Sequence, residues 1–84
     1  MHDLHAANYL TKIVLEQAKI SNLFKVTKII IELGPVLEHN ELIKPANLRF
    51  NIKMLCRDTV AKDAKVEIIR TKAGHFKLIA IEGT

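Results

Sequence analysis

The stretch that most constrains the fold is Val26–Leu33 (VTKIIIEL), which is dense in β-branched residues and ends at Gly34-Pro35. Such a run favours an extended strand, and a Gly-Pro pair stops it. Because apolar side chains occur at alternate and at adjacent positions, we expect a central strand, or one covered by helices on one face. Strict alternation predicts one face made of Thr27, Ile29, Ile31 and Leu33, and another made of Val26, Lys28, Ile30 and Glu32.

Two segments flanking this strand have helical periodicity. Apolar residues at steps of three and four predict a helix from Asp3 or Leu4 to Ile20, with Asp3 suited to cap it. Its buried face would comprise Leu4, Ala7, Leu10, Val14 and Ala18. A second helix is predicted from Pro45, a residue favoured at the first helical position, to about Cys56 or Arg57. Its buried face would comprise Leu48, Ile52 and Leu55, flanked by Phe50 and Met54. Residues 35–44 are predicted to form a long loop.

The last third of the chain predicts two more strands, at residues 64–71 and 75–82, joined by a hairpin turn at Lys72-Ala73-Gly74. Gly74 stands where a positive φ is expected. In the final strand, alternation places Phe76, Leu78 and Ala80 on one side and Ile79 and Ile81 on the other. The element order is therefore α-β-α-β-β. This order predicts a single two-layer α+β domain, with two helices on one face of a three-stranded mixed sheet.

Composition narrows the function classes. The one cysteine among 84 residues excludes an internal disulfide and a zinc site built on several thiolates. No stretch approaches the roughly 20 apolar residues of a membrane span, and no signal-peptide pattern opens the chain, so we expect a cytoplasmic protein. The net charge of +4 permits a nucleic-acid or acidic-protein partner, but the lysines are dispersed without interleaved aromatics, so nucleic acid is a weak alternative. Catalytic motifs are lacking, which predicts a protein that is not an enzyme.

The first three residues, Met1-His2-Asp3, offer a set of metal ligands. A terminal amine, backbone amides and the His2 imidazole lie within two residues and can close five- and six-membered chelate rings on one ion. Nickel(II) and copper(II) favour such square-planar nitrogen sets. The predicted primary ligands are His2 and the amide of Asp3, with the Met1 amine as a further nitrogen. Because the metal displaces protons, its affinity should fall as pH falls.

The remaining candidate residues are weaker. His39 lies in the long loop beside Glu38 with Glu41 close by, so His39 and Glu41 form a candidate auxiliary metal site; a solvated loop is the alternative interpretation. His5 is expected to face solvent. His75 is expected to have a structural role, and Cys56 to be a small buried hydrophobe.

Four stretches resemble the HypA/HybF family of hydrogenase nickel-incorporation proteins over nearly the whole chain. They are MHDLHAANYLTKIVLEQAK, VTKIIIELGP, PANLRFNIKMLCRDTVAKDAKVEI and GHFKLIAIE. The resemblance implies transient nickel(II) binding at the N-terminus through His2 and neighbouring backbone nitrogens. It also implies a metallochaperone that works with a GTPase to deliver nickel to the hydrogenase large subunit, and in some organisms to urease. A homodimer is a further possible assembly of this chain.

The chain departs from that family in three places. The family normally carries a zinc module with two CxxC pairs between the second and third strands, where this chain has Lys72-Ala73-Gly74, so no structural zinc is expected. Asp3 replaces the more usual glutamate. Lys44 replaces a carboxylate near the nickel, where a cation would repel the metal, so His39 or Glu41 would have to substitute. We therefore expect residues 1–84 to form a minimal HypA-like nickel-binding domain. The alternative is a relic of that fold that serves as a protein-interaction or dimerisation module without nickel delivery.

Overall fold

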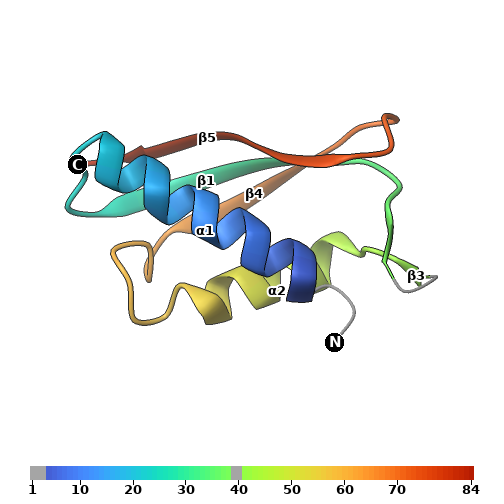
Figure 1. Ribbon diagram of the computed structural model, residues 1–84, viewed down its shortest axis with the longest axis horizontal. Helices are drawn as coiled ribbons and strands as arrows, with labels where there is room; N and C mark the ends of the chain where they lie inside the picture. The colour runs from blue at the N-terminus through green and yellow to red at the C-terminus, as the bar shows by residue number, and fades with distance from the viewer. Residues whose placement is uncertain (1–3, 39–40) are drawn as a thin grey trace.

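The computed structural model describes residues 4–38 and 41–84 and contains two helices and five strands in these two ranges. The elements are α1 (Leu4–Ile20), β1 (Val26–Leu33), β2 (Leu37–Glu38), β3 (Glu41–Leu42), α2 (Pro45–Leu55), β4 (Lys65–Arg70) and β5 (Phe76–Gly83). The main sheet has the order β4-β1-β5, with β1 parallel to β4 and antiparallel to β5. Both helices lie on one face of this sheet (Figure 1). The predicted two-layer α+β domain with a mixed sheet is therefore confirmed.

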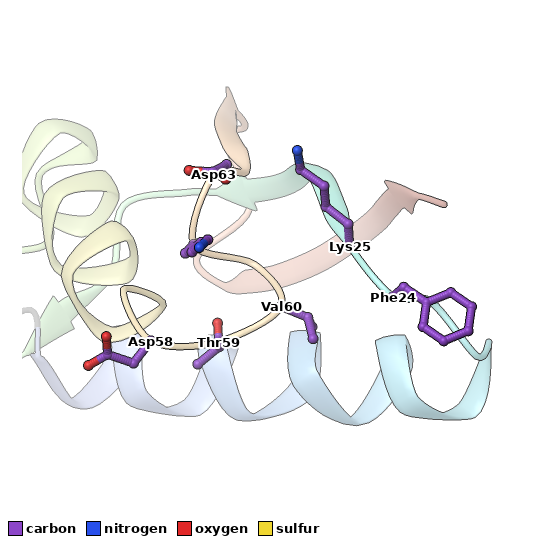
Figure 2. A pocket seen from close by; sticks show the side chains of 7 residues that line it. Phe24, Lys25, Asp58, Thr59, Val60 and Asp63 are labelled. Atoms are coloured by element: carbon purple, nitrogen blue, oxygen red, sulfur yellow. The ribbon is translucent and has the colours of Figure 1, made fainter.

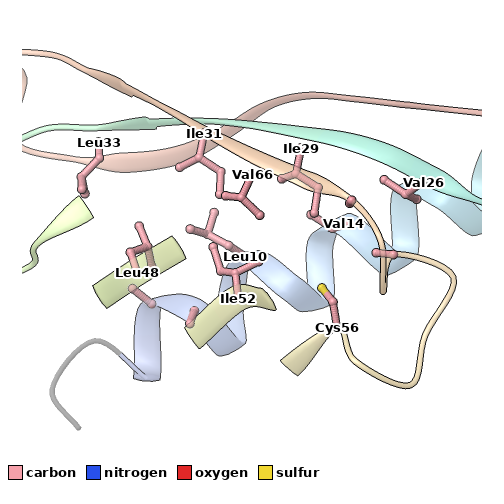
Figure 3. Packing of buried hydrophobic residues seen from close by; sticks show 14 of the residues in the cluster. Leu10, Val14, Val26, Ile29, Ile31, Leu33, Leu48, Ile52, Cys56 and Val66 are labelled. Atoms are coloured by element: carbon pink, nitrogen blue, oxygen red, sulfur yellow. The ribbon is translucent and has the colours of Figure 1, made fainter. Parts of the chain in front are cut away.

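The core lies between the helices and the sheet. Leu10 and Val14 of α1 and Leu48 and Ile52 of α2 are fully buried, and buried residues of β1 face them (Figure 3). The buried residues of β1 are Val26, Ile29, Ile31 and Leu33. Because β1 is the central strand and faces both helices, it holds the two layers together, as its β-branched composition predicts.

Strict alternation was wrong at two positions, and bulges explain both. Val26 is buried and Thr27 exposed, because the β1–β5 register shifts between Val26 and Lys28. In β5, Leu78 pairs with Ile31 and Ala80 with Ile30, so Ile79 is an extra residue. A bulge of this kind reverses the facing of the residues that follow it. Leu78 and Ile81 consequently both pack against the core, whereas Ile79 and Ala80 are exposed.

The segment predicted as a loop at residues 35–44 contains a short antiparallel hairpin. Leu37 pairs with Leu42, and Glu38 pairs with Glu41. The Ile43 backbone N–H donates to the Val36 carbonyl at 3.0 Å, and the Ile43 side chain is buried in the core. The hairpin is therefore attached to the body just before α2 begins.

Chain reversals also differ from expectation. The predicted hairpin between the last two strands is wrong, because β1 lies between β4 and β5 and the turn at residues 71–75 crosses the end of β1. No glycine in the described ranges has a positive φ, so Gly74 does not need the left-handed conformation expected of it. Asn22 does adopt that conformation, with φ 56°, where α1 ends. The N–H of Leu23 donates to the Ala18 carbonyl and that of Asn22 to the Lys19 carbonyl, the two bonds of a Schellman motif. Asparagine tolerates this backbone, which explains why the helix stops there.

The sheet face away from the helices carries charged residues. Lys28 of β1 and Glu67 of β4 form an ion pair at 3.1 Å. The hydrogen bond from Lys28 to Glu67, aided by the charge of that carboxylate, raises the pKa of Lys28. Among the described helices, none is long and apolar enough to cross a membrane.

Candidate functional site

The predicted primary ligands, Met1, His2 and Asp3, lie outside the described residues, and so does His39. The structure describes the element that follows them. Helix α1 begins at Leu4, immediately after the three candidate ligands, as the periodicity predicted.

The first turns of α1 are held firmly by the rest of the domain. Ala6 and Ala7 have no exposed surface, and Leu10, one turn further on, is also fully buried. The helices α1 and α2 pack against each other. His5 is exposed, in agreement with the prediction that it faces solvent. The attachment point of the first three residues is therefore fixed by core packing.

The auxiliary candidate Glu41 lies in β3, on the hairpin that precedes α2, and is exposed. Lys44 follows in an extended conformation (φ −92°, ψ 134°), occupies the position before Pro45 and makes no side-chain capping bond. Its exposed ammonium group stands where the family resemblance leads one to expect a carboxylate. Within residues 4–38 and 41–84, no three His, Cys, Asp or Glu side chains come together in a group that could hold a metal ion.

His75 makes a contact that sequence reasoning missed. Its Nε2 lies 2.7 Å from Oε1 of Glu32, and both side chains are partly buried. The pair ties the start of β5 to the end of β1, which is consistent with the structural role expected for His75. It lies beside the turn at residues 71–75, whose ends bond to β1 through Thr71 N–H to the Leu33 carbonyl and Gly34 N–H to the His75 carbonyl. Only the antiparallel pairing of β1 with β5 brings these distant residues together.

Cys56 is buried at the end of α2. Burial raises the pKa of its thiol, because an apolar environment disfavours the thiolate. The side chain therefore stays protonated at neutral pH and acts as a small hydrophobe, as predicted, and not as a nucleophile or a metal ligand.

An open hollow lies between the α1–β1 and α2–β4 connections (Figure 2). Its lining comprises Phe24, Lys25, Asp58, Thr59, Val60, Lys62 and Asp63. The lining carries both signs of charge and offers no imidazole or thiol. The hollow adjoins the C-terminal end of α1, and the 17 residues of that helix place it about 25 Å from Leu4. It is therefore not part of a site at the start of the chain.

The fold and the residues that form it match a known class of protein. Residues 1–76 match the family model described as "Hydrogenase/urease nickel incorporation, metallochaperone, hypA". This class consists of metallochaperones, which are accessory proteins for nickel insertion, so the prediction of a non-catalytic protein agrees with it. The chain belongs to the HypA family.

Individual relatives support this assignment. The chain is 32% identical over 68 residues to the hydrogenase maturation factor HypA of Methanobrevibacter smithii, covering 81% of this chain and 51% of that protein. It is 33% identical over 72 residues to HypA of Crocosphaera subtropica. That match covers 86% of this chain and 57% of the relative. The chain thus spans about half the length of the curated relatives it matches. The solution structure of the Ni metallochaperone HypA from Helicobacter pylori has the same fold, with a TM-score of 0.77 at 14% identity, over 99% of this chain and 97% of that one.

Proposed function

We propose that this chain is a nickel-binding accessory domain that assists the maturation of nickel enzymes, nickel–iron hydrogenase first and urease second. Nickel(II) is its cargo and binds at the start of the chain. The His2 imidazole and the backbone amide of Asp3 are the primary ligands, and the Met1 amine is a further nitrogen. The observation that carries this proposal is the family match over residues 1–76, because it includes these three residues.

A nickel ion bound at the start of α1 needs negatively charged ligands. The positive end of the helix dipole opposes a nearby dication by up to about 1 kcal/mol. The first turn of α1 contains no acidic residue that would offset this. The negative charge must therefore come from the ligands, through an amide that loses its proton and through the carboxylate of Asp3. Affinity for nickel should then fall steeply with decreasing pH, because each displaced proton is recovered by its ligand.

The positive charge of Lys44, just before α2, must also be offset if nickel binds nearby. Lys44 is a fixed positive charge at the position where a carboxylate is expected. We assign His39 and Glu41, which precede Lys44 in the sequence, as auxiliary ligands that would offset this charge. Glu41 lies in β3 of the hairpin before α2 and is exposed.

In this function, residues 1–84 form one domain without structural zinc. Its only cysteine is buried in the core, and a short turn bonded to β1 joins β4 to β5 where the family's zinc module would stand. Its partners would be a nickel-delivering GTPase and the hydrogenase large subunit, in the cytoplasm.

The test is calorimetric titration of nickel into the untagged chain with Met1 as first residue, beside His2→Ala. We expect one nickel per chain and a loss of at least roughly a hundredfold in affinity, about 2.7 kcal/mol, in the variant. His5→Ala is the matched control, because His5 is exposed on α1 close behind the site, and it should keep the wild-type affinity.

Nickel binding that is equal in His2→Ala and wild type would refute the proposed site. If neither chain binds nickel while both remain folded, the domain is better described as a fold relic that acts in protein interaction or dimerisation.

A further inference from the structure

Helix α2 and the residues at its two ends carry an excess of positive charge. Residues 44–57 contain four cations, Lys44, Arg49, Lys53 and Arg57, and no acidic residue. The whole chain has 13 Lys and Arg and 9 Asp and Glu, so the other nine cations are balanced by nine acids. The net charge of +4 therefore equals the charge of this one segment.

The outward face of α2 arranges these cations in a row. Arg49 and Lys53 are four residues apart, which places them about 6 Å apart along the helix axis, and Arg57 follows in the turn after the end of α2. A second row, Phe50 and Met54, runs beside them. All five side chains are exposed, Phe50 at 66% and Met54 at 36%. The opposite face of α2 is buried through Leu48, Asn51 and Ile52.

The cations of this face are not neutralised within the described parts of the chain. None of Lys44, Arg49, Lys53 and Arg57 takes part in an ion pair there. Arg49 is held in place instead, because its Nε donates to the Val66 carbonyl at 3.3 Å. Val66 belongs to β4, an edge strand of the sheet. The face therefore continues from α2 onto the edge of the sheet.

From this arrangement we infer that the outward face of α2 binds an acidic amphipathic helix of a partner protein. Side chains at steps of four form the ridges that pack into the grooves of a second helix. A partner helix with carboxylates at steps of four would match the row of cations, and its apolar side chains would cover Phe50 and Met54. Charges of opposite sign across the contact accelerate association and fix the relative position of the helices.

Two other classes of partner fit less well. Insertion into a membrane surface depends on a broad apolar face, and α2 exposes two large apolar side chains. Single-stranded nucleic acid is bound by basic grooves with several stacking aromatics, and this face has one aromatic residue, Phe50.

The test is NMR titration of the ¹⁵N-labelled chain, without nickel, with a synthetic helical peptide whose exposed rows are glutamate and leucine. A peptide with glutamine in place of glutamate is the charge control. We expect shift changes confined to α2 and the adjoining edge of β4, and much weaker binding of the glutamine peptide. Lys53→Glu and Arg57→Glu should each weaken binding about tenfold, and Phe50→Ala should also weaken it.

The control variants are Lys12→Glu, an exposed cation on α1, and Phe24→Ala, an apolar side chain exposed at 87% far from α2. Both should bind the peptide as the wild type does. Absence of binding, shifts elsewhere on the protein, or tighter binding of an oligonucleotide or of anionic phosphatidylglycerol vesicles would overturn the inference. Because the titration contains no nickel, its result is independent of the metal site.

Discussion

Gly34→Ala is expected to lower the free energy of unfolding more than Leu10→Ala does. A Cβ at residue 34 would overlap the carbonyl oxygen of Ala73 and lie 3.3 Å from Cγ2 of Thr71. The overlap is with backbone, so a change of side-chain rotamer cannot relieve it. The turn would have to move away from β1, which breaks the bonds from Gly34 N–H to the His75 carbonyl and from Thr71 N–H to the Leu33 carbonyl.

The expected loss is about 4 kcal/mol or more in the free energy of unfolding. A chain of this length has roughly 4–12 kcal/mol in total. Urea denaturation followed by circular dichroism measures the change. The matched control is Gly74→Ala in the same turn, where a Cβ meets only the Pro35 carbonyl oxygen, at an ordinary 3.5 Å. It should change stability by less than about 1 kcal/mol. Equal effects of the two variants would contradict the close approach at Gly34.

Leu10→Ala is expected to have the second largest effect. Leu10 is fully buried where α1 meets α2 and the sheet, close to Leu48 and Ile52 (Figure 3). Removing its isobutyl group leaves a cavity among side chains that both layers hold in place. Such substitutions cost about 2–5 kcal/mol. Thermal and urea unfolding both report this loss.

Ile20→Ala is the control on the same helix, because Ile20 is 72% exposed at the last residue of α1. Its expected effect is within about 0.5 kcal/mol, as for other surface substitutions. If Leu10→Ala were as mild as Ile20→Ala, the packing of α1 between α2 and the sheet would be wrong.

The elements with strong periodicity could be predicted from the sequence. Helix α1 and strand β1 begin and end where the pattern of apolar residues and the stop signals placed them, and α2 begins at the expected Pro45. Each of these signals is local. The two-residue strands β2 and β3 are too short to produce a pattern, and they form because their ends are anchored by Val36 and Ile43.

The bulges and the His75–Glu32 pair could not be predicted in this way. The facing of Ile79 and Ile81 depends on the register between β5 and β1, which no local pattern encodes. His75 and Glu32 are 43 residues apart and meet only after that register is set. The charged face of α2 was obscured for a different reason. Its cations are four to five residues apart in the sequence, and their common exposure beside Phe50 and Met54 is visible only in the folded helix.

The assignment of the candidate metal ligands is based on their chemistry and on family membership. Their residue types and spacing suggested nickel before any comparison, and the family match includes them. The structure adds that α1 starts immediately behind them and is fixed by Ala6 and Ala7.

The most direct test of nickel binding at the start of the chain is a titration with the Met1 amine blocked. Nickel is titrated into the untagged chain and into a chain with one additional acetylated residue before Met1, in two buffers of different ionisation enthalpy. The free chain should bind one nickel per chain and release protons, including one from a backbone amide, and the blocked chain should bind at least about tenfold more weakly, a loss of roughly 1.4 kcal/mol. Equal affinity and equal proton release in the two chains would contradict the proposed site.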